Sequence, residues 1–315
     1  MNKVLATNAS FAKYSRKAQE ILEGYGLETV RPGQASVTEE GLLDDLEDVV
    51  AIITGLEPIT GRIINSAPGL KVIVKHGIGV DNIDLDAAKE KGVIVANSPG
   101  TNREAVADLV FGLMLSLARK ISQSDRQVRE GKWPKVFGQS VWGKTIGIIG
   151  LGVIGRSVVQ RAKGFNMTVL AFDKFWNEEY ARANGIIYSD VEGILKEADF
   201  VSLHVPLMEE TRNLIGAAQL NLMKPTAYLI NAARGGVVDE AALFTALSKG
   251  KIAGAGIDVF SSEPPVNSSL LELENVILTP HMGGFTDGAL SMTSEYVAQT
   301  VVDALEGKEL KSRIV

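Results

Sequence analysis

Short apolar runs recur along the whole chain, and longer amphipathic stretches separate them. The runs are rich in valine and isoleucine, and they cover residues 4–6, 49–53, 72–74, 93–95, 146–149, 169–172, 201–203, 228–230, 256–257 and 276–278. A strand buried on both faces has a continuous apolar run, whereas a strand with one solvated face alternates apolar and polar residues. The runs therefore predict parallel strands covered by helices on both faces, which places the chain in the α/β class.

Length and charge limit the possibilities further. The 315 residues are too many for one ordinary small domain and suit two. A net charge of −6 argues against a nucleic-acid partner, because binding to phosphates needs a basic face. No apolar run reaches the roughly 18–20 residues of a membrane helix, and the start of the chain becomes polar too soon for a signal peptide. We therefore expect a cytoplasmic protein with no membrane partner.

The reactive side chains are few. The chain has no cysteine, which excludes disulfides, thiolate nucleophiles and zinc sites built from cysteine. We predict no metal site. Only His76, His204 and His281 are available as histidine acid–base groups, and this scarcity narrows the search for a proton carrier.

Residues 102 to about 130 break the alternation. Their apolar side chains have helical spacing and follow a turn-forming segment, so we predict one long helix capped by Asn102 or Thr101. Such a helix exceeds what one sheet face needs: it bridges two domains, packs against a second subunit, or is a long core helix. Four apolar residues could contribute to a two-fold dimer interface or be buried within the monomer: Leu113, Leu117, Trp133 and Trp142. We expect a homodimer.

A glycine-rich turn lies between a predicted strand and a predicted helix. Gly150, Gly152 and Gly155 form a G-x-G-x-x-G pattern directly after the run 146–149. The first glycine permits a tight turn, the second lets the backbone approach a pyrophosphate, and the third lets the helix pack closely on the strand. The pyrophosphate would bind the helix N-terminus near Val153 and Ile154.

An acidic residue ends the next strand. Asp173 follows the run 169–172, about 20 residues after the glycines. A carboxylate there accepts hydrogen bonds from a ribose diol and repels a 2′-phosphate, which favours NAD over NADP. The adjacent Lys174 leaves the choice of cofactor open, and an incidental acid in a surface turn is the structural alternative.

Four further motifs extend the pattern through the C-terminal half. They are Leu203-His204-Val205-Pro206-Leu207 with Thr211 soon after, residues 229–236 (LINAARGG), residues 255–265 (AGIDVFSSEPP) and residues 278–284 (LTPHMGG). With the glycine turn, they make the chain resemble the D-isomer-specific 2-hydroxyacid dehydrogenases, closest to the short phosphoglycerate dehydrogenase-like members. The resemblance covers essentially the whole chain.

The resemblance implies an NAD-dependent transfer of hydride at C2 of a D-2-hydroxy acid. It also implies two doubly wound parallel-sheet domains, a Rossmann NAD-binding domain inserted into a flavodoxin-like substrate domain. The substrate domain would comprise residues 1–98 completed by 286–315, and the dinucleotide domain residues 99–285.

His281 is the predicted acid–base residue, because only imidazole titrates near neutrality without perturbation. Glu263 would accept its other ring N–H, and Arg234 would bind the substrate carboxylate and the developing alkoxide. His204 is the second candidate for the base. By resemblance Asp258 lies near the nicotinamide amide, an acid that simply ends a strand being the alternative. The remaining residues predicted to line the cofactor are His204, Val205, Pro206, Thr211, Ala232, Ala233, Arg234, His281, Gly283 and Gly284.

Two loops are predicted to bind the substrate. Lys75, His76, Gly77, Ile78 and Gly79 resemble the family's glycine-rich substrate loop, whose backbone N–H groups would bind a carboxylate.

Asn102 belongs to the next such loop, which resembles the phosphoglycerate type, whereas Glu57 would repel a phosphate. A phosphorylated substrate such as 3-phosphoglycerate therefore stays open. The alternatives are an NADP-dependent reductase of glyoxylate or hydroxypyruvate, and a corepressor-like protein that only binds a dinucleotide.

Overall fold

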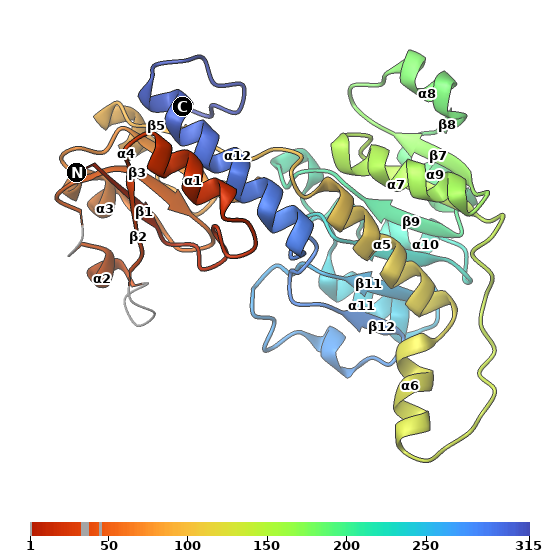
Figure 1. The fold of residues 1–315 in the computed structure, drawn as a ribbon. Coiled ribbons are helices and arrows are strands. Elements are labelled where there is room, and N and C mark those ends of the chain that lie inside the picture. Colours follow the sequence, from red (N-terminus) through yellow and green to blue (C-terminus); the bar gives the residue numbers. More distant parts are fainter. Residues whose placement is uncertain (1, 33–37, 44–45) are drawn as a thin grey trace. The chain divides into compact units, whose positions relative to one another are not determined.

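The chain forms two compact units, each with its own parallel sheet (Figure 1). The computed structural model describes residues 2–32, 38–43 and 46–315. Unit 1 comprises Met1–Asn102 and Phe285–Val315, and unit 2 comprises Arg103–Gly284. Unit 2 is thus inserted into the sequence of unit 1. The predicted α/β class with two parallel-sheet domains is confirmed.

Unit 1 has a five-stranded parallel sheet in the order β2-β1-β3-β4-β5, the flavodoxin-like order. Its strands are β1 (Lys3–Ala6), β2 (Glu28–Val30), β3 (Val49–Thr54), β4 (Val72–Lys75) and β5 (Ile94–Ala96). Its helices are α1 (Lys17–Gly24), α2 (Glu39–Leu43), α3 (Gly61–Ser66), α4 (Leu85–Lys91) and α12 (Asp287–Leu305). Alternate strand residues pack on opposite faces: Val4 lies in a cluster with Val297 of α12, and Leu5 in one with Ile63 of α3.

Unit 2 has a seven-stranded parallel sheet in the order β12-β11-β10-β9-β6-β7-β8. Its strands are β6 (Thr145–Ile149), β7 (Thr168–Phe172), β8 (Ile186–Tyr188), β9 (Phe200–Leu203), β10 (Tyr228–Asn231), β11 (Gly254–Ile257) and β12 (Val276–Leu278). The strand order changes direction between β6 and β9: β7 and β8 follow on one side of β6, and β9 to β12 follow on the other. In open α/β folds, ligands bind at such a switch point.

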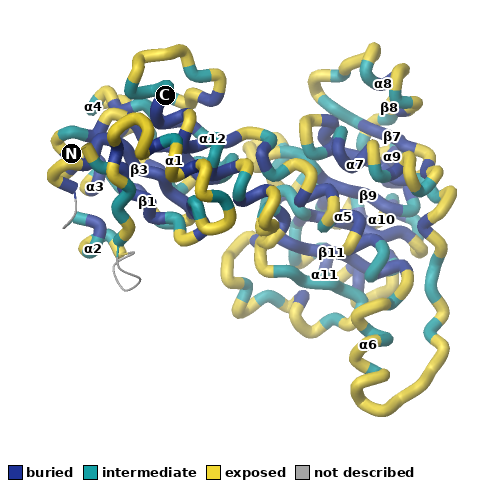
Figure 2. Tube along the Cα trace, viewed as in Figure 1, coloured by how far each residue is buried: buried dark blue, intermediate teal, exposed yellow. Residues whose placement is uncertain are grey.

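Helices cover both faces of this sheet. Those of unit 2 are α5 (Arg103–Ala118), α6 (Ile121–Arg129), α7 (Val153–Gly164), α8 (Glu178–Asn184), α9 (Val191–Glu197), α10 (Ala217–Leu222) and α11 (Glu240–Ser248). Ile148 of β6 packs in the cluster of α5 and α7, whereas the next residue, Ile149, packs in the cluster of α9, α10 and α11. The strands are therefore buried on both faces, as Figure 2 shows for β9 and β11.

All ten apolar runs lie on strands, so that prediction is confirmed. Two strands, β2 and β8, were not predicted from the sequence; each lies at one edge of its sheet. Each has only three residues and is largely accessible to solvent, so neither shows the continuous apolar run of a buried strand.

The prediction of one long helix over 102–130 is wrong. The segment forms two helices, α5 and α6, and Lys120 between them has a left-handed backbone with φ of 56°. Leu113 and Leu117 of α5 are buried in the core of unit 2, so they are not available for a subunit interface. Trp133 and Trp142 are exposed, and no residue of α6 is buried (Figure 2). None of the helices among the described residues could cross a membrane.

Candidate active site

The predicted site residues of unit 2 gather at one edge of its sheet. Because the strands are parallel, the residues that follow them lie at the same carboxyl edge. The segments concerned are Gly150–Gly155 after β6, Asp173 after β7, His204–Thr211 after β9, Ala232–Arg234 after β10, Asp258–Glu263 after β11 and His281–Gly284 after β12.

The glycine turn has the geometry that a dinucleotide requires. Gly150 has a φ of 102°, a conformation that side chains disfavour. A Cβ atom on Gly155 would lie 2.2 Å from the carbonyl oxygen of Gly150, so the third glycine permits close packing of α7. Gly152 faces open space and caps α7 without a side-chain acceptor. The first amides of α7 are thus left for an anion, which fits a pyrophosphate.

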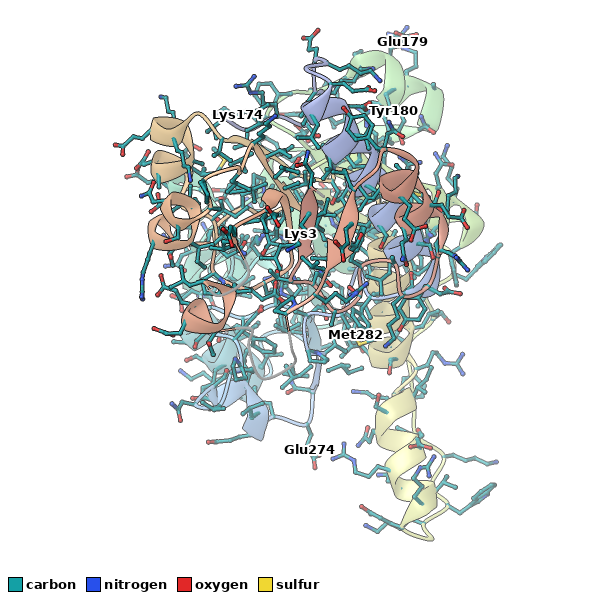
Figure 3. All side chains as sticks on the ribbon, turned by 60° about the vertical axis from the view of Figure 1, so that its left-hand side comes forward. Lys3, Lys174, Glu179, Tyr180, Glu274 and Met282 are labelled. Atoms are coloured by element: carbon teal, nitrogen blue, oxygen red, sulfur yellow. The ribbon has the colours of Figure 1, made fainter. Side chains whose placement is uncertain are left out.

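Asp173 is tied to the glycine turn. Its Oδ2 accepts a hydrogen bond of 2.6 Å from the amide of Leu151, and its Oδ1 accepts one of 2.8 Å from the amide of Phe175. A carboxylate has about four acceptor positions, so it keeps capacity for a ribose diol. The neighbouring ammonium of Lys174, labelled in Figure 3, lies 3.6 Å from the carboxylate of Glu210. The residues present therefore fit NAD.

His204 is a weak candidate for the proton carrier. Its Nε2 shares a hydrogen bond of 2.9 Å with the Ser202 hydroxyl, and its Nδ1 is a buried atom without a hydrogen-bond partner among the described residues. Burial lowers the pKa of His204 to about 4. The ring is therefore neutral at neutral pH and binds a proton poorly, which disfavours this second candidate.

His281 and Glu263 are in direct contact. Nδ1 of His281 lies 2.8 Å from Oε2 of Glu263, and an ionised carboxylate can only accept, so the ring N–H donates. The other carboxylate oxygen, Oε1, accepts a hydrogen bond of 3.1 Å from the amide of Phe260. The pair is partly accessible to solvent, which leaves the imidazole within reach of a substrate.

Asp258 holds the loop that carries His281. Its buried carboxylate accepts three hydrogen bonds, from the Thr279 hydroxyl (2.6 Å), the Met282 amide (2.9 Å) and the Gly283 amide (2.9 Å). Figure 3 labels Met282, which follows His281. The Asp258 carbonyl also accepts from the amide of His281 at 2.8 Å. Thr279 was not predicted as a site residue, although its position two residues before His281 was the available signal.

Arg234 lies on the neighbouring loop. Its guanidinium is half-buried and donates to the Ala233 carbonyl at 2.7 Å. The side chain of Asn231, another residue that sequence reasoning missed, donates to the Arg234 carbonyl at 3.0 Å and accepts from the Ala233 amide at 3.2 Å. A Cβ on Gly235 would lie 1.9 Å from the Phe260 carbonyl oxygen. The Arg234 turn is therefore in close contact with the segment that leads to Glu263.

The loop after β9 is also braced internally. The Thr211 hydroxyl donates to the Pro206 carbonyl at 2.6 Å and accepts from the Met208 amide at 2.8 Å. His204 donates its amide to the Ile149 carbonyl at 2.8 Å, which joins this loop to the end of β6. The predicted cofactor residues of this loop thus lie beside the glycine turn.

The predicted substrate residues lie in unit 1, apart from Arg234. The Lys75 side chain is buried and donates to the Gly55 carbonyl and to Oδ1 of Asn82. His76 is buried, with Nε2 3.0 Å from the Ser294 hydroxyl, and burial lowers the pKa of His76 to about 4.

Two backbone amides of the 75–79 loop donate hydrogen bonds within unit 1. The His76 amide donates to the Thr54 carbonyl, and the Gly77 amide donates to the Ser98 hydroxyl, each at 2.8 Å. Ile78 and Gly79 are partly exposed, and Oδ1 of Asn102 is buried without a hydrogen-bond partner among the described residues. The substrate roles of these residues stay predictions.

Comparison with known sequences matches unit 2 to a family model for the NAD-binding domain of D-isomer-specific 2-hydroxyacid dehydrogenases, over residues 111–283. D-3-phosphoglycerate dehydrogenase of Methanocaldococcus jannaschii is 43% identical, over 95% of this chain and 57% of the relative. Glyoxylate reductase of Korarchaeum cryptofilum is 41% identical, over 87% of this chain and 85% of the relative. The chain thus spans little more than half of the first relative and most of the second.

Comparison with solved structures gives matches over nearly the whole chain. D-lactate dehydrogenase of Escherichia coli, in its apo form, has a TM-score of 0.88 and 29% identity, over 100% of both chains. D-lactate dehydrogenase of Aquifex aeolicus, complexed with NAD and lactic acid, has a TM-score of 0.82 and 30% identity, over 97% of this chain and 96% of that chain.

Proposed function

We propose that this chain, which belongs to the D-isomer-specific 2-hydroxyacid dehydrogenase family, transfers a hydride between NAD and C2 of a small D-2-hydroxy acid or 2-oxo acid. The observation that carries the proposal is the 2.8 Å contact between His281 and Glu263 at the sheet edge that also holds the glycine turn. An imidazole held by a carboxylate is a proton carrier, and the turn supports binding of a dinucleotide beside it.

Each catalytic side chain has a defined role in this mechanism. NAD, when bound, supplies the carbon that accepts or donates the hydride. His281 takes the hydroxyl proton during oxidation and returns it during reduction, with Nε2 as the reacting atom because Nδ1–H is held by Glu263. Glu263 also stabilises the imidazolium that forms. Arg234 keeps its charge and binds the substrate carboxylate through its planar fork.

We rank an unphosphorylated 2-oxo acid, such as glyoxylate or hydroxypyruvate, above a phosphorylated substrate. In unit 1 the Glu57 carboxylate accepts hydrogen bonds from the Thr7 hydroxyl (3.0 Å) and the Gly55 amide (2.8 Å), at the carboxyl ends of β1 and β3. A fixed negative charge there disfavours a phosphate. The chain covers 85% of a glyoxylate reductase but 57% of a D-3-phosphoglycerate dehydrogenase, which supports the same ranking. 3-Phosphoglycerate is the second candidate.

The direct test is a screen with both NADH and NADPH. Glyoxylate, hydroxypyruvate, 2-oxoglutarate and the 2-oxo acid derived from 3-phosphoglycerate would be supplied to the full chain, and oxidation of the cofactor followed by absorbance. We expect turnover of at least one unphosphorylated acid, faster with NADH, and a loss of roughly 10²–10⁴-fold in kcat for His281→Ala. The proposal would be contradicted if His281→Ala turned over substrate as fast as wild type, or if wild type turned over none of the acids.

We also propose that the enzyme works in the cytoplasm as a homodimer that contacts its partner through the segment from α6 to Trp142. This segment exposes several large apolar side chains, including Ile121, Val128, Trp133, Phe137 and Trp142. Large exposed apolar side chains in one segment support a subunit contact.

A further inference from the structure

Glu240 joins two loops at the carboxyl edge of the unit 2 sheet. It is the first residue of α11 and ends the loop that begins after β10 and carries Arg234. Its Oε1 accepts hydrogen bonds from the amide (2.6 Å) and the hydroxyl (2.7 Å) of Ser261, in the loop after β11. Its Oε2 lies 3.4 Å from the Ser268 hydroxyl, farther along the same loop. One carboxylate therefore holds both flanks of the segment that contains Glu263.

The backbone that Glu240 holds bonds to Glu263, the partner of His281, and lies close to the turn that carries Arg234. The Phe260 amide donates to Oε1 of Glu263, and Oε2 of Glu263 accepts from His281. A Cβ on Gly235 would lie 1.9 Å from the Phe260 carbonyl oxygen and 2.6 Å from the Ser261 amide nitrogen. This backbone therefore lies close to the turn that carries Arg234. A shift of the peptide between Phe260 and Ser261 would therefore move the contacts of Glu263 and Arg234 together.

Glu240 is not needed to cap its own helix. The side chain of Asp239 already caps α11 by accepting from the Ala242 amide at 3.0 Å. Both oxygens of Glu240 are thereby left for Ser261 and Ser268. A negative charge in the first turn of a helix is stabilised by the helix dipole, and bonds to an ionised acceptor are stronger than neutral ones.

We infer that Glu240 is a positioning residue for the dehydrogenase reaction: it fixes the Phe260–Ser261 backbone and so keeps Glu263 on His281 and the Arg234 turn in place. The inference depends on the proposed function for its activity readout. It assigns Glu240 no contact with substrate or cofactor.

The test compares Glu240→Ala and Glu240→Gln with Glu272→Ala, an exposed carboxylate of the same region that serves as the matched control. We expect Glu240→Ala to lower kcat roughly 10-fold, because small displacements of catalytic groups are costly. NADH affinity, measured by fluorescence titration, should change less than kcat, since the glycine turn that binds the pyrophosphate lies on another loop. Glu240→Gln keeps an acceptor oxygen for Ser261 and should recover most of the activity. Glu272→Ala should match wild type.

A double variant separates positioning from a general loss of stability. In the background of Glu263→Gln, the change Glu240→Ala should have much less effect on kcat than it has alone, because its route to His281 passes through Glu263. Full additivity of the two losses, or wild-type kcat in Glu240→Ala, would overturn the inference while leaving the proposed function intact. An inactive wild type would instead count against the proposed function. If Glu240→Ala does not fold, Glu240→Gln carries the test, and a kcat roughly 10-fold below wild type in a well-folded Glu240→Gln protein would overturn the inference.

Discussion

At the residue scale, the histidine proposed as the proton carrier depends on a buried acid whose carboxylate bonds to the loop around it. His281 has a left-handed backbone with φ of 52°, which is unfavourable for a residue with a side chain. The Asp258 carboxylate compensates by accepting from Thr279, Met282 and Gly283 on both sides of His281. The acid expected near the nicotinamide amide is thus also the anchor of the His281 loop.

Asp258→Asn should therefore damage both stability and catalysis. Asparagine has one acceptor oxygen and would place an amide N–H₂ against backbone N–H donors, so at least one buried donor loses its partner. We expect the free energy of unfolding to fall by about 1–3 kcal/mol and kcat to fall about 100-fold. Urea denaturation and steady-state kinetics measure the two effects. A variant with wild-type kcat would contradict the anchoring role.

At the scale of the element, close contacts between backbones decide where strands, turns and helices meet. The turn after β6 and the first turn of α7 approach each other at Gly150 and Gly155, where no side chain fits. Gly164, at the other end of α7, faces open space. The two ends of one helix therefore differ in what they tolerate.

Gly155→Ala should displace the start of α7, since its Cβ would lie 2.2 Å from the Gly150 carbonyl oxygen. We expect the Kd for NADH to rise at least about 10-fold and the protein to lose about 1–3 kcal/mol of stability. Gly164→Ala is the matched control and should be neutral or slightly stabilising. Equal NADH affinity in both variants, measured by fluorescence titration, would show that the close approach does not control the site.

At the scale of the whole molecule, two histidines with lowered pKa values make stability depend on pH. Burial lowers the pKa of His76 and of His204 from 6.5 to about 4. Between these values the unfolded chain binds more protons than the folded chain, so the free energy of unfolding falls as the pH falls from about 6.5 to about 4. Above about pH 6.5 both rings are largely neutral in the folded and the unfolded chain, so this penalty on the folded state is absent.

We expect each of these histidines to account for a loss of about 2 kcal/mol between pH 7 and pH 5. His76→Gln, which can still bond to Ser294, should remove about half of the pH dependence that the two rings cause together. Urea unfolding midpoints at both pH values, for wild type and variant, measure the effect. Parallel losses in the two proteins would contradict the assignment.

The proposed dimer also belongs to the whole molecule. Trp133, Phe137 and Trp142 are 85%, 91% and 66% exposed, which is unusual for side chains of this size. Trp133→Glu should shift the protein from dimer to monomer in light scattering after gel filtration, because a buried carboxylate without a partner destabilises an interface. Lys132→Glu, an adjacent exposed position, is the control and should leave the oligomeric state unchanged. A wild type that is already monomeric would rule the proposal out.

Features that depend on local pattern were predictable from the amino-acid sequence. Buried strands need continuous apolar runs, and a dinucleotide turn needs glycines at fixed spacing, so both were predictable from neighbouring residues. The position of His281, Arg234 and Asp173 at one sheet edge also followed, because each lies within three residues of the end of a parallel strand.

The partners of those residues, in contrast, depend on how distant segments pack. The Ser294 hydroxyl on His76, the Gly55 carbonyl on Lys75 and the Glu240 carboxylate on Ser261 come from segments that lie 20 to 218 residues away in the sequence. The break at Lys120 likewise separates a buried α5 from an exposed α6, although the apolar spacing continues across it. Such contacts depend on which elements pack together in three dimensions, and no local pattern records that.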